Sequence, residues 1–194
     1  IFAKYLYDYK YTIEKTFTIE TPGGIVRAEI IEEKYEKAFT IKVDMGKAVF
    51  ESSKIPVSFK KDECINETLH LEYRDYQINC VSVGNPHCVI LKEELDEKEI
   101  KIFGSQIENH SMFPNRINVQ FAKIISPTVV EILIWERGAG WTLASGSSSC
   151  AVASVVSKMD LTERNLTIKM PGGELKIEID DSWNLMMTGE VREI

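Results

Sequence analysis

The alternation of hydrophobic and polar positions along the chain predicts a protein built mostly from β-strands. Runs with a period of two, or rich in β-branched residues, are separated by Gly, Pro, Asn and Asp, which favour turns. The expected strands cover residues 16–21, 25–31, 38–45, 69–83, 117–125 and 129–136. Two stretches with helical spacing interrupt them. One covers about Glu97 to Glu108 and ends near Asn109, and the other runs from just after Gly146 to about Lys158.

The first eight residues, IFAKYLYD, carry apolar side chains at Phe2, Tyr5 and Leu6. This spacing indicates an amphipathic helix. Because the helical pattern is already under way at the first residue and no Met precedes it, we expect further residues upstream.

An internal repeat joins the two ends of the chain. The stretch FTIETPGGIVRAEI at 17–30 aligns without gaps with LTIKMPGGELKIEI at 166–179, and half of the positions are identical. At the same offset, IFAKYLYD lies beside CAVASVVS, so an expected helix precedes both copies. PGG turns are common in hairpins, but the matching helix and strands favour a repeated architecture.

Composition narrows the class of partner. With 194 residues, 44% hydrophobic and 27% charged, the chain can bury a sizeable core in one large or two small domains. A net charge of −7 argues against a nucleic-acid partner. Without a long apolar run or a basic-then-apolar leader, we expect a cytoplasmic protein that binds neither membrane nor nucleic acid. Four cysteines without CxxC spacing and three histidines indicate reduced thiols and no metal site.

The stretch ERGAGWTLASGSSSCA at 136–151 contains the most unusual chemistry. A glycine followed by small residues at a helix start, here Gly146 and Ser147, exposes N–H groups at the positive end of the helix dipole. Such a start can bind a carboxylate or a phosphate. Taken alone, this feature is more often a serine-rich N-cap without any ligand.

Polar residues at the ends of predicted strands favour a small-molecule site. Asn85 and His87 lie at a turn that leaves one strand, Asn118 lies early in another, and Glu136 and Arg137 end a third. Strand ends are where a pocket draws its polar groups. Each residue alone also has a structural explanation, and a lone histidine such as His87 is more often a structural residue than a functional one.

Six motifs in this order carry a resemblance to a known family. They are TPGGIV, VDMG (43–46), VGNPHCV (83–89), GSQIENHSMFPNRINVQF (104–121), ERGAG with TLA and G (136–146), and MPGGELKIE with MTG (187–189). The chain resembles diaminopimelate epimerase, an amino-acid epimerase that works without a cofactor, from just after that family's first active-site loop to near its C-terminus.

The resemblance implies an α+β fold of two pseudo-symmetric domains, each a curved, mostly antiparallel sheet around a central helix, with the substrate between them. Residues 1–38 would form the remaining part of the N-terminal domain, and residues 39–185 the C-terminal domain. Residues 186–194 would form a C-terminal segment that returns to the first domain.

The resemblance also implies two-base catalysis, in which two cysteines flank the substrate α-carbon and no cofactor or metal takes part. The second cysteine's position is Ser145 here, and the first would fall about five residues before Ile1, so we expect the chain alone to be inactive. The family roles fall on His87 and Glu136 in catalysis, on Asn85, Asn118, Glu136 and Arg137 in substrate binding, and on the backbone of Gly146 and Ser147 as a cradle for the α-carboxylate.

Three interpretations of Ser145 stay open. It is an engineered replacement that traps a complex, a natural variant in a relative that racemises another amino acid, or a mark of lost or altered activity. The neighbouring Ser148, where the family has glycine, departs from the family pattern too and favours natural divergence. Cys150 and Cys88 are expected to be buried structural thiols and not substitutes.

The predicted function is therefore interconversion of LL- and meso-diaminopimelate, with a small amino acid as the bound partner. One alternative is a racemase for a single amino acid such as histidine, favoured by Ser145 and by Trp141 in the ERGAG loop. Another is a catalytically silent protein that binds amino acids. Long strand edges and an acidic surface permit a homodimer.

Overall fold

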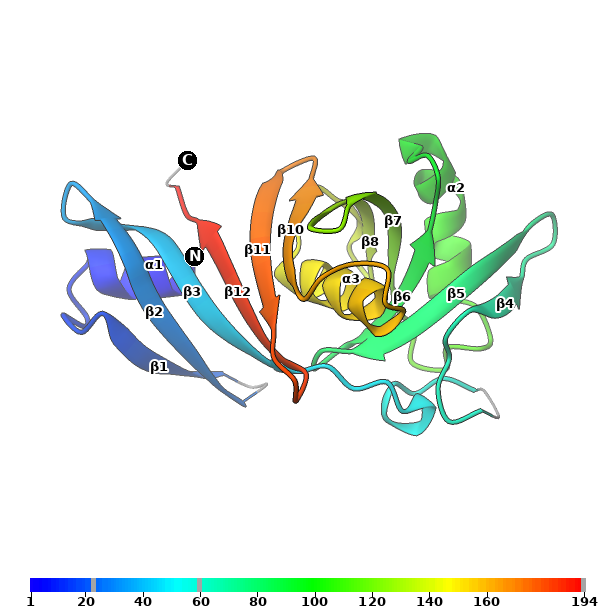
Figure 1. Ribbon diagram of the computed structural model, residues 1–194, viewed down its shortest axis with the longest axis horizontal. Coiled ribbons are helices and arrows are strands. Elements are labelled where there is room, and N and C mark those ends of the chain that lie inside the picture. The colour runs from blue at the N-terminus through cyan, green and yellow to red at the C-terminus, as the bar shows by residue number, and fades with distance from the viewer. Residues whose placement is uncertain (22–23, 59–60, 193–194) are drawn as a thin grey trace.

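The computed structural model describes residues 1–21, 24–58 and 61–192 (Figure 1). Its elements follow in the order α1 (Phe2–Asp8), β1 (Thr16–Thr21), β2 (Gly24–Lys34), β3 (Lys37–Lys47), η1 (Ser52–Lys54), β4 (Glu67–His70), β5 (Asp75–Ser82), β6 (Pro86–Leu91), α2 (Glu97–Glu108), β7 (Asn118–Ser126), β8 (Val129–Glu136), β9 (Gly140–Thr142), α3 (Gly146–Lys158), β10 (Asn165–Met170), β11 (Gly173–Ile179) and β12 (Asn184–Glu190). The two long helices therefore begin and end as the sequence pattern predicts.

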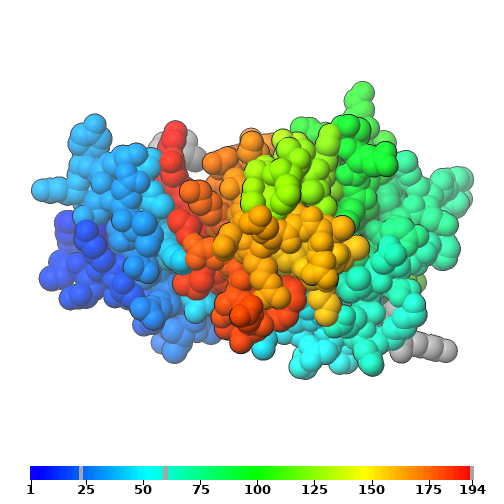
Figure 2. All heavy atoms as spheres, viewed as in Figure 1, coloured from blue at the N-terminus to red at the C-terminus, as the bar shows by residue number. Residues whose placement is uncertain are grey.

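The strands form one sheet in the order β1-β2-β3-β12-β11-β10-β8-β7-β6-β5-β4, with β9 paired to β8 (Figure 1). Neighbours are antiparallel except for the pairs β8/β10 and β6/β7, which are parallel. The last strand, β12, lies between β3 and β11. In Figure 2 the atoms of the last strands accordingly lie between the N-terminal hairpins and the middle of the chain. The predicted domain boundary after residue 38 falls inside β3, and the domain division stays a prediction.

The internal repeat is present in the hairpins. In the first copy Thr18 pairs with Arg27, and in the second Thr167 pairs with Lys176, so both hairpins have the same register at one constant offset. A helix precedes each hairpin, α1 in the first copy and α3 in the second. Pro22 and Gly23 of the first TPGG turn lie outside the described residues. An α+β fold with a repeated helix–hairpin unit is confirmed.

The central strands are covered on both faces. Because side chains alternate between the two faces of a strand, Val119 and Phe121 of β7 pack with α2, while Ala122 packs with α3. Helix α3 is almost wholly buried from Ser148 to Ser157. The polar residues of β6 to β8 that share the α3 face are therefore enclosed between sheet and helix, where they need partners.

The apolar stripe predicted for the first helix is wrong. Phe2 and Tyr5 are exposed, and the buried side chains are Ala3, Lys4 and Tyr7. Polar contacts explain why this face is buried. Lys4 Nζ donates to the Ala38 carbonyl at 2.7 Å, and the Tyr7 hydroxyl donates to the Glu33 carboxylate of β2.

The single strand predicted over residues 69–83 is also wrong. A turn closed by a hydrogen bond from Leu71 N to Arg74 O, 2.9 Å long, divides it into β4 and β5. Among the helices of the described residues, none has the length and apolarity needed to cross a bilayer.

Candidate functional site

The N-terminus of α3 has two backbone N–H groups available for a ligand. Ser145 is the N-cap, its Oγ accepts from Ser148 N at 3.5 Å, and its carbonyl accepts from Ser149 N at 3.1 Å. The first N–H groups of a helix have no partner within the helix, and those of Gly146 and Ser147 have no acceptor elsewhere in the described chain. The helix start thus keeps the geometry of an anion site.

The second PGG turn holds the loop that precedes this helix. Gly172 N donates to Leu143 O at 2.8 Å, and a Cβ on Gly172 would lie only 2.9 Å from the same oxygen. Met170 Sδ accepts from Ser145 N at 3.4 Å. The MPGG motif therefore positions residues 143–145 and with them the N-cap.

Glycine at the first helical position lies close to two methionine side chains. A Cβ on Gly146 would lie 2.8 Å from Met187 Sδ, with Met45 Cε 4.0 Å away. Met187 belongs to β12 and Met45 to β3, which are paired strands. The VDMG and MTG motifs thus bring the strands of the N-terminal part against the α3 N-terminus.

A second polar group lies at the starts of β6 and β7. His87 Nε2 is 2.9 Å from Asn85 Oδ1, and Asn118 Nδ2 donates to Pro86 O at 2.8 Å. Asn118 Oδ1 accepts from Arg137 N at 3.0 Å. His87 is the second residue of β6 and fully buried, so placing it in the turn was wrong; Asn85 does lie in the turn. Asn118 thereby ties the turn after β8 to the start of β6.

The Glu136 and Arg137 side chains contact different partners. Glu136 Oε2 accepts from Thr142 Oγ1 at 3.4 Å, and Arg137 Nη1 donates to Asn115 O at 3.0 Å. Both side chains are half-buried. In the described structure no hydrogen bond joins the two charged groups to each other.

Gln120, which the sequence analysis did not single out, links the two groups. It is fully buried in β7, on the same face as Asn118, and its Nε2 donates to Ser148 Oγ at 3.0 Å. Its signal in the sequence is a lone amide inside an apolar run, two residues after Asn118. Through Gln120 the sheet residues connect to the N-terminus of α3.

Glu108 was also missed, and it anchors the loop that carries Glu136 and Arg137. This carboxylate is 5% exposed and accepts from Trp135 Nε1 and Gly138 N, both at 2.8 Å, and from Arg116 Nη1 at 3.2 Å. An acidic residue at the C-terminal end of a helix opposes the helix dipole. That unfavourable placement was the signal that Glu108 has specific partners.

The cysteines near the site are structural, as predicted. Cys150 lies inside α3 and is fully buried, and burial raises the pKa of its thiol to about 12. Cys88 lies on the α2 face of β6, opposite Cys80 of β5. Neither thiol can take the place of Ser145.

Trp141 also lies on the α2 side. It pairs with Trp135 across β8 and β9, and Lys101 Nζ of α2 lies 4.6 Å from the centre of its ring. Packing against α2 accounts for this side chain. Trp141 therefore gives no support to a histidine racemase.

The enclosed polar environment keeps His87 neutral. Burial lowers the pKa of His87 from its ordinary value of 6.5 to about 3; a hydrogen bond with Gln120 opposes this shift and the charge of Arg137 adds to it. At neutral pH the ring has one proton, so it is a hydrogen-bond donor at one nitrogen and an acceptor at the other.

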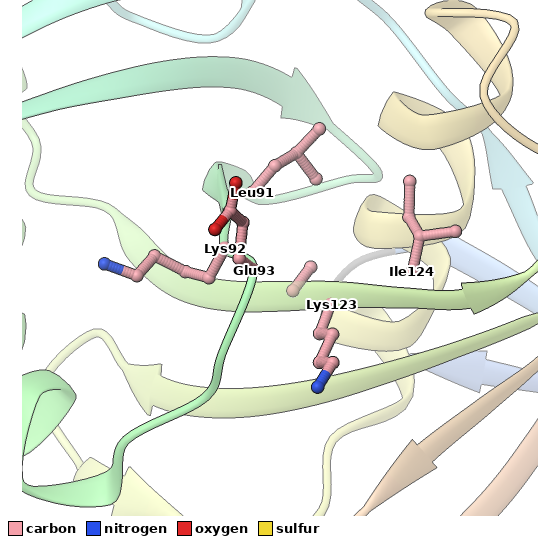
Figure 3. Close-up of a pocket in the computed structure, with 6 residues that line it drawn as sticks. Leu91, Lys92, Glu93, Lys123 and Ile124 are labelled. Carbon is pink, nitrogen blue, oxygen red and sulfur yellow. The ribbon is translucent and has the colours of Figure 1, made fainter.

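The pocket shown in Figure 3 lies elsewhere. It has a volume of about 330 Å³ and is lined by Leu91, Lys92, Glu93, Ala122, Lys123 and Ile124. These residues are at the far ends of β6 and β7 from Asn85, His87 and Asn118. The described residues hold no group of three or more His, Cys, Asp or Glu side chains placed to bind a metal ion.

Known proteins resemble the chain over nearly its whole length. A family model for diaminopimelate epimerase matches residues 79–194. Diaminopimelate epimerase 2 of Nostoc sp. PCC 7120 is 42% identical over 194 residues, covering 100% of this chain and 67% of the relative. The diaminopimelate epimerase of Alkaliphilus metalliredigens is 36% identical over 193 residues, covering 100% of this chain and 68% of the relative. The chain thus spans about two thirds of the length of these relatives.

Two solved structures share the fold at low sequence identity. A probable proline racemase from Agrobacterium radiobacter K84, with bound carbonate, has a TM-score of 0.73 at 12% identity and covers 97% of this chain and 62% of its own. A hydroxyproline epimerase from Agrobacterium vitis, with bound trans-4-hydroxy-L-proline, has a TM-score of 0.72 at 11% identity over 97% of this chain and 61% of its own. At these identities the likeness shows the fold alone.

Replacing Glu108 by Ala is expected to destabilise the protein. The change leaves the Trp135 and Gly138 N–H groups without an acceptor, so we expect the free energy of unfolding to fall by ~2–5 kcal/mol. Urea denaturation measures it. Glu97→Ala, which removes a surface ion pair from the same helix, should cost less than ~0.5 kcal/mol. Equal losses in the two variants would contradict the anchoring role of Glu108.

Burial of neutral His87 predicts a pH-dependent stability. Because the folded-state pKa is depressed, the unfolded chain binds more protons than the folded protein between about pH 3 and 6.5. The contribution of neutral His87 to the free energy of unfolding is fully present above pH 6.5. It falls by ~1.4 kcal/mol per pH unit as the pH falls through this window. Urea denaturation from pH 7 to 4 should show a shallower slope for His87→Gln than for His70→Gln, which changes an exposed histidine. Identical slopes would contradict this prediction.

Proposed function

The chain belongs to the diaminopimelate epimerase family, and on that premise we propose that it forms the greater part of an enzyme that interconverts LL- and meso-diaminopimelate. The reaction moves the α-proton at one of the two amino-acid centres of the substrate, without a pyridoxal cofactor. The relatives bearing this name match the whole chain.

The observation that carries the proposal is the start of α3. Two N–H groups, of Gly146 and Ser147, have no acceptor in the described structure, and the glycine packs closely against the end of the Met187 side chain. A carboxylate bound there meets N–H donors and the positive end of the helix dipole. These groups would stabilise the charge that develops when the α-proton leaves, which is the main energetic requirement of the reaction.

The polar residues on the strands suit the other end of the substrate. Asn85 and Asn118 lie at the starts of adjacent strands, and in this proposal their amides bind the distal amino-acid centre. Glu136 and Arg137, on the neighbouring loop, would bind an ammonium and a carboxylate group. Diaminopimelate has two of each of these charged groups, which is why the proposal names it over an amino acid with one centre.

Ser145 suits proton donation better than proton removal. Its Oγ accepts from Ser148 N, which leaves its O–H free to donate. A hydroxyl is a far weaker acid than a thiol, so removing a proton would need a stronger base than Ser145 provides. In this proposal a base outside the chain removes the α-proton from one face, Ser145 delivers its own proton to the opposite face, and solvent then restores the hydroxyl. His87, neutral and buried, acts by hydrogen bonding and takes no proton.

Two other functions remain as alternatives. A racemase for a single amino acid such as histidine is favoured only by Ser145, because Trp141 packs on the far side of the sheet. A binding protein without activity would keep the helix start but exchange no proton.

Exchange of the α-proton with solvent distinguishes the three functions. The full-length protein is incubated in deuterated water with LL-diaminopimelate and, separately, with a panel of L-amino acids that includes histidine. Mass spectrometry should show α-deuteration of diaminopimelate and of no panel member. Deuteration of histidine alone would move the function to the first alternative. If no compound exchanges while calorimetry detects binding, the protein is a binder and the proposed reaction is wrong.

Replacing Ser145 by Cys should accelerate exchange. A thiol supplies both an acid and a base near neutral pH, so we expect an increase of roughly 10²-fold. Ser145→Ala should lower exchange by a similar factor, and Ser105→Cys, at an exposed position of α2, should leave the rate unchanged. The role of Ser145 is refuted by an alanine variant that exchanges as fast as the unchanged protein.

A further inference from the structure

Arg116 has a backbone conformation that is rare for its residue type. Its φ is 57°, in the left-handed region that residues with a side chain seldom adopt. Two contacts hold it there. Arg116 N donates to Phe113 O at 2.9 Å, and its Nη1 donates to Glu108 Oε1 at 3.2 Å. Strain of this kind persists where the surrounding structure enforces it, and it is frequent at functional sites. The contacts of Arg116 therefore indicate its role.

The left-handed conformation directs the carbonyl of Asn115. Because the peptide between residues 115 and 116 is planar, the φ angle of Arg116 sets the orientation of this carbonyl relative to the chain that follows. Asn115 O accepts from Arg137 Nη1 at 3.0 Å. The turn at Arg116 thus provides an acceptor for one side of the Arg137 guanidinium.

The side chain of Arg116 acts on the residue that follows Arg137. Glu108 Oε1 accepts from Arg116 Nη1 at 3.2 Å and from Gly138 N at 2.8 Å. A Cβ on Gly138 would lie 3.7 Å from Arg116 Nη1, so the guanidinium of Arg116 lies beside this glycine. A buried carboxylate needs a compensating charge. The charge of Arg116 therefore stabilises the carboxylate that holds Gly138.

Arg137 is held at three points. Its own N donates to Asn118 Oδ1 at 3.0 Å, its guanidinium donates to Asn115 O, and the next N–H along the chain donates to Glu108. A guanidinium has five N–H donors, and within the described residues the Asn115 carbonyl is its one acceptor. The remaining donors form the planar fork that binds a carboxylate. The contact with Asn115 therefore determines where that fork points.

We propose that Arg116 is a positioning residue that orients the Arg137 guanidinium towards the distal carboxylate of the substrate. Its strained backbone places the Asn115 acceptor, and its charge stabilises the Glu108 carboxylate on the other side of Arg137. Arg116 thereby acts on substrate selection through Arg137. The binding of a carboxylate by Arg137 rests on the proposed function, whereas the orientation of Arg137 by Arg116 does not depend on it.

Arg74 provides a matched control, because it forms a similar ion pair away from these contacts. The Arg74 side chain is 47% exposed and pairs with Glu99, which is 10% exposed; the Arg116 side chain is 54% exposed and pairs with Glu108, which is 6% exposed. Both acidic partners belong to α2. Arg74 lies in the turn between β4 and β5, at one edge of the sheet. A merely structural ion pair at Arg116 predicts equal effects of Arg116→Asn and Arg74→Asn.

Hydrogen exchange of the full-length protein tests whether Arg116 holds the loop. Asparagine tolerates the left-handed conformation, so Arg116→Asn removes the guanidinium and leaves the backbone conformation in place. NMR should show the amide protons of Arg137 and Gly138 exchanging roughly 10-fold faster in this variant. Their exchange should be unchanged in Arg74→Asn. Unchanged exchange of both amides in Arg116→Asn overturns the positioning role.

A double-mutant cycle tests whether Arg116 acts through Arg137. In Arg116→Asn, KM for LL-diaminopimelate should rise roughly 10-fold, with a smaller change in kcat, because a charged hydrogen bond to the substrate is weakened. Arg116→Lys keeps the charge and should restore most of the loss, and Arg74→Asn should leave KM unchanged. In a protein that already has Arg137→Gln, adding Arg116→Asn should raise KM no further. An unchanged KM in Arg116→Asn, or the same rise in the presence of Arg137→Gln, overturns the proposal.

Failure of the proposed function gives a different result. If the unchanged protein exchanges no α-proton of diaminopimelate, the proposed function fails, and the assignment of a carboxylate to Arg137 fails with it. Hydrogen exchange at Arg137 and Gly138 then still decides whether Arg116 positions Arg137.

Discussion

The close packing of Gly146 against Met187 is the constraint on which the rest of the site depends. It places the start of α3, with two unpaired N–H groups, directly beside β12 and β3. A Cβ at position 146 would require the end of the Met187 side chain to move. The MPGG turn supports the helix start from the opposite direction through Gly172 and Met170. Motifs far apart in sequence thus position one short segment, the start of α3.

The period of two in the strands decides which polar residues reach that segment. His87, Asn118, Gln120 and Glu136 all lie on the face of the sheet that α3 covers, whereas Cys88 and Trp135 lie on the face that α2 covers. A shift of one residue in any of these strands would bury the site residues under α2. The strand register therefore determines which polar side chains lie in the site. The long apolar runs that surround these residues keep that register unique.

The sequence predicts the elements that short-range patterns determine. Both long helices, the repeated hairpins and the strand-end positions of Asn118 and Glu136 follow from periodicity and turn residues. The failures have longer-range causes. The first helix buries Lys4 because Ala38, far along the chain, supplies an acceptor. Gln120 and Glu108 were missed because their partners, Ser148 and the loop after Trp135, become neighbours only when the sheet is formed. Patterns in sequence indicate which side chains are buried but do not name their partners.

The serines after residue 144 show how such partners determine the role of each residue in a motif. Ser148 Oγ pairs with Gln120 of the sheet, and Ser149 Oγ donates to Ser145 O at 2.9 Å and lies 3.3 Å from Met170 Sδ. Neither is a generic N-cap residue, because each has its own partner. A glycine at position 148 would leave the Gln120 amide unpaired in an enclosed space, at a cost of roughly 1–3 kcal/mol. Ser148 therefore supplies a hydrogen-bond partner for the Gln120 amide that the glycine of the family pattern cannot supply, so the divergence around Ser145 extends to the buried contacts of the site.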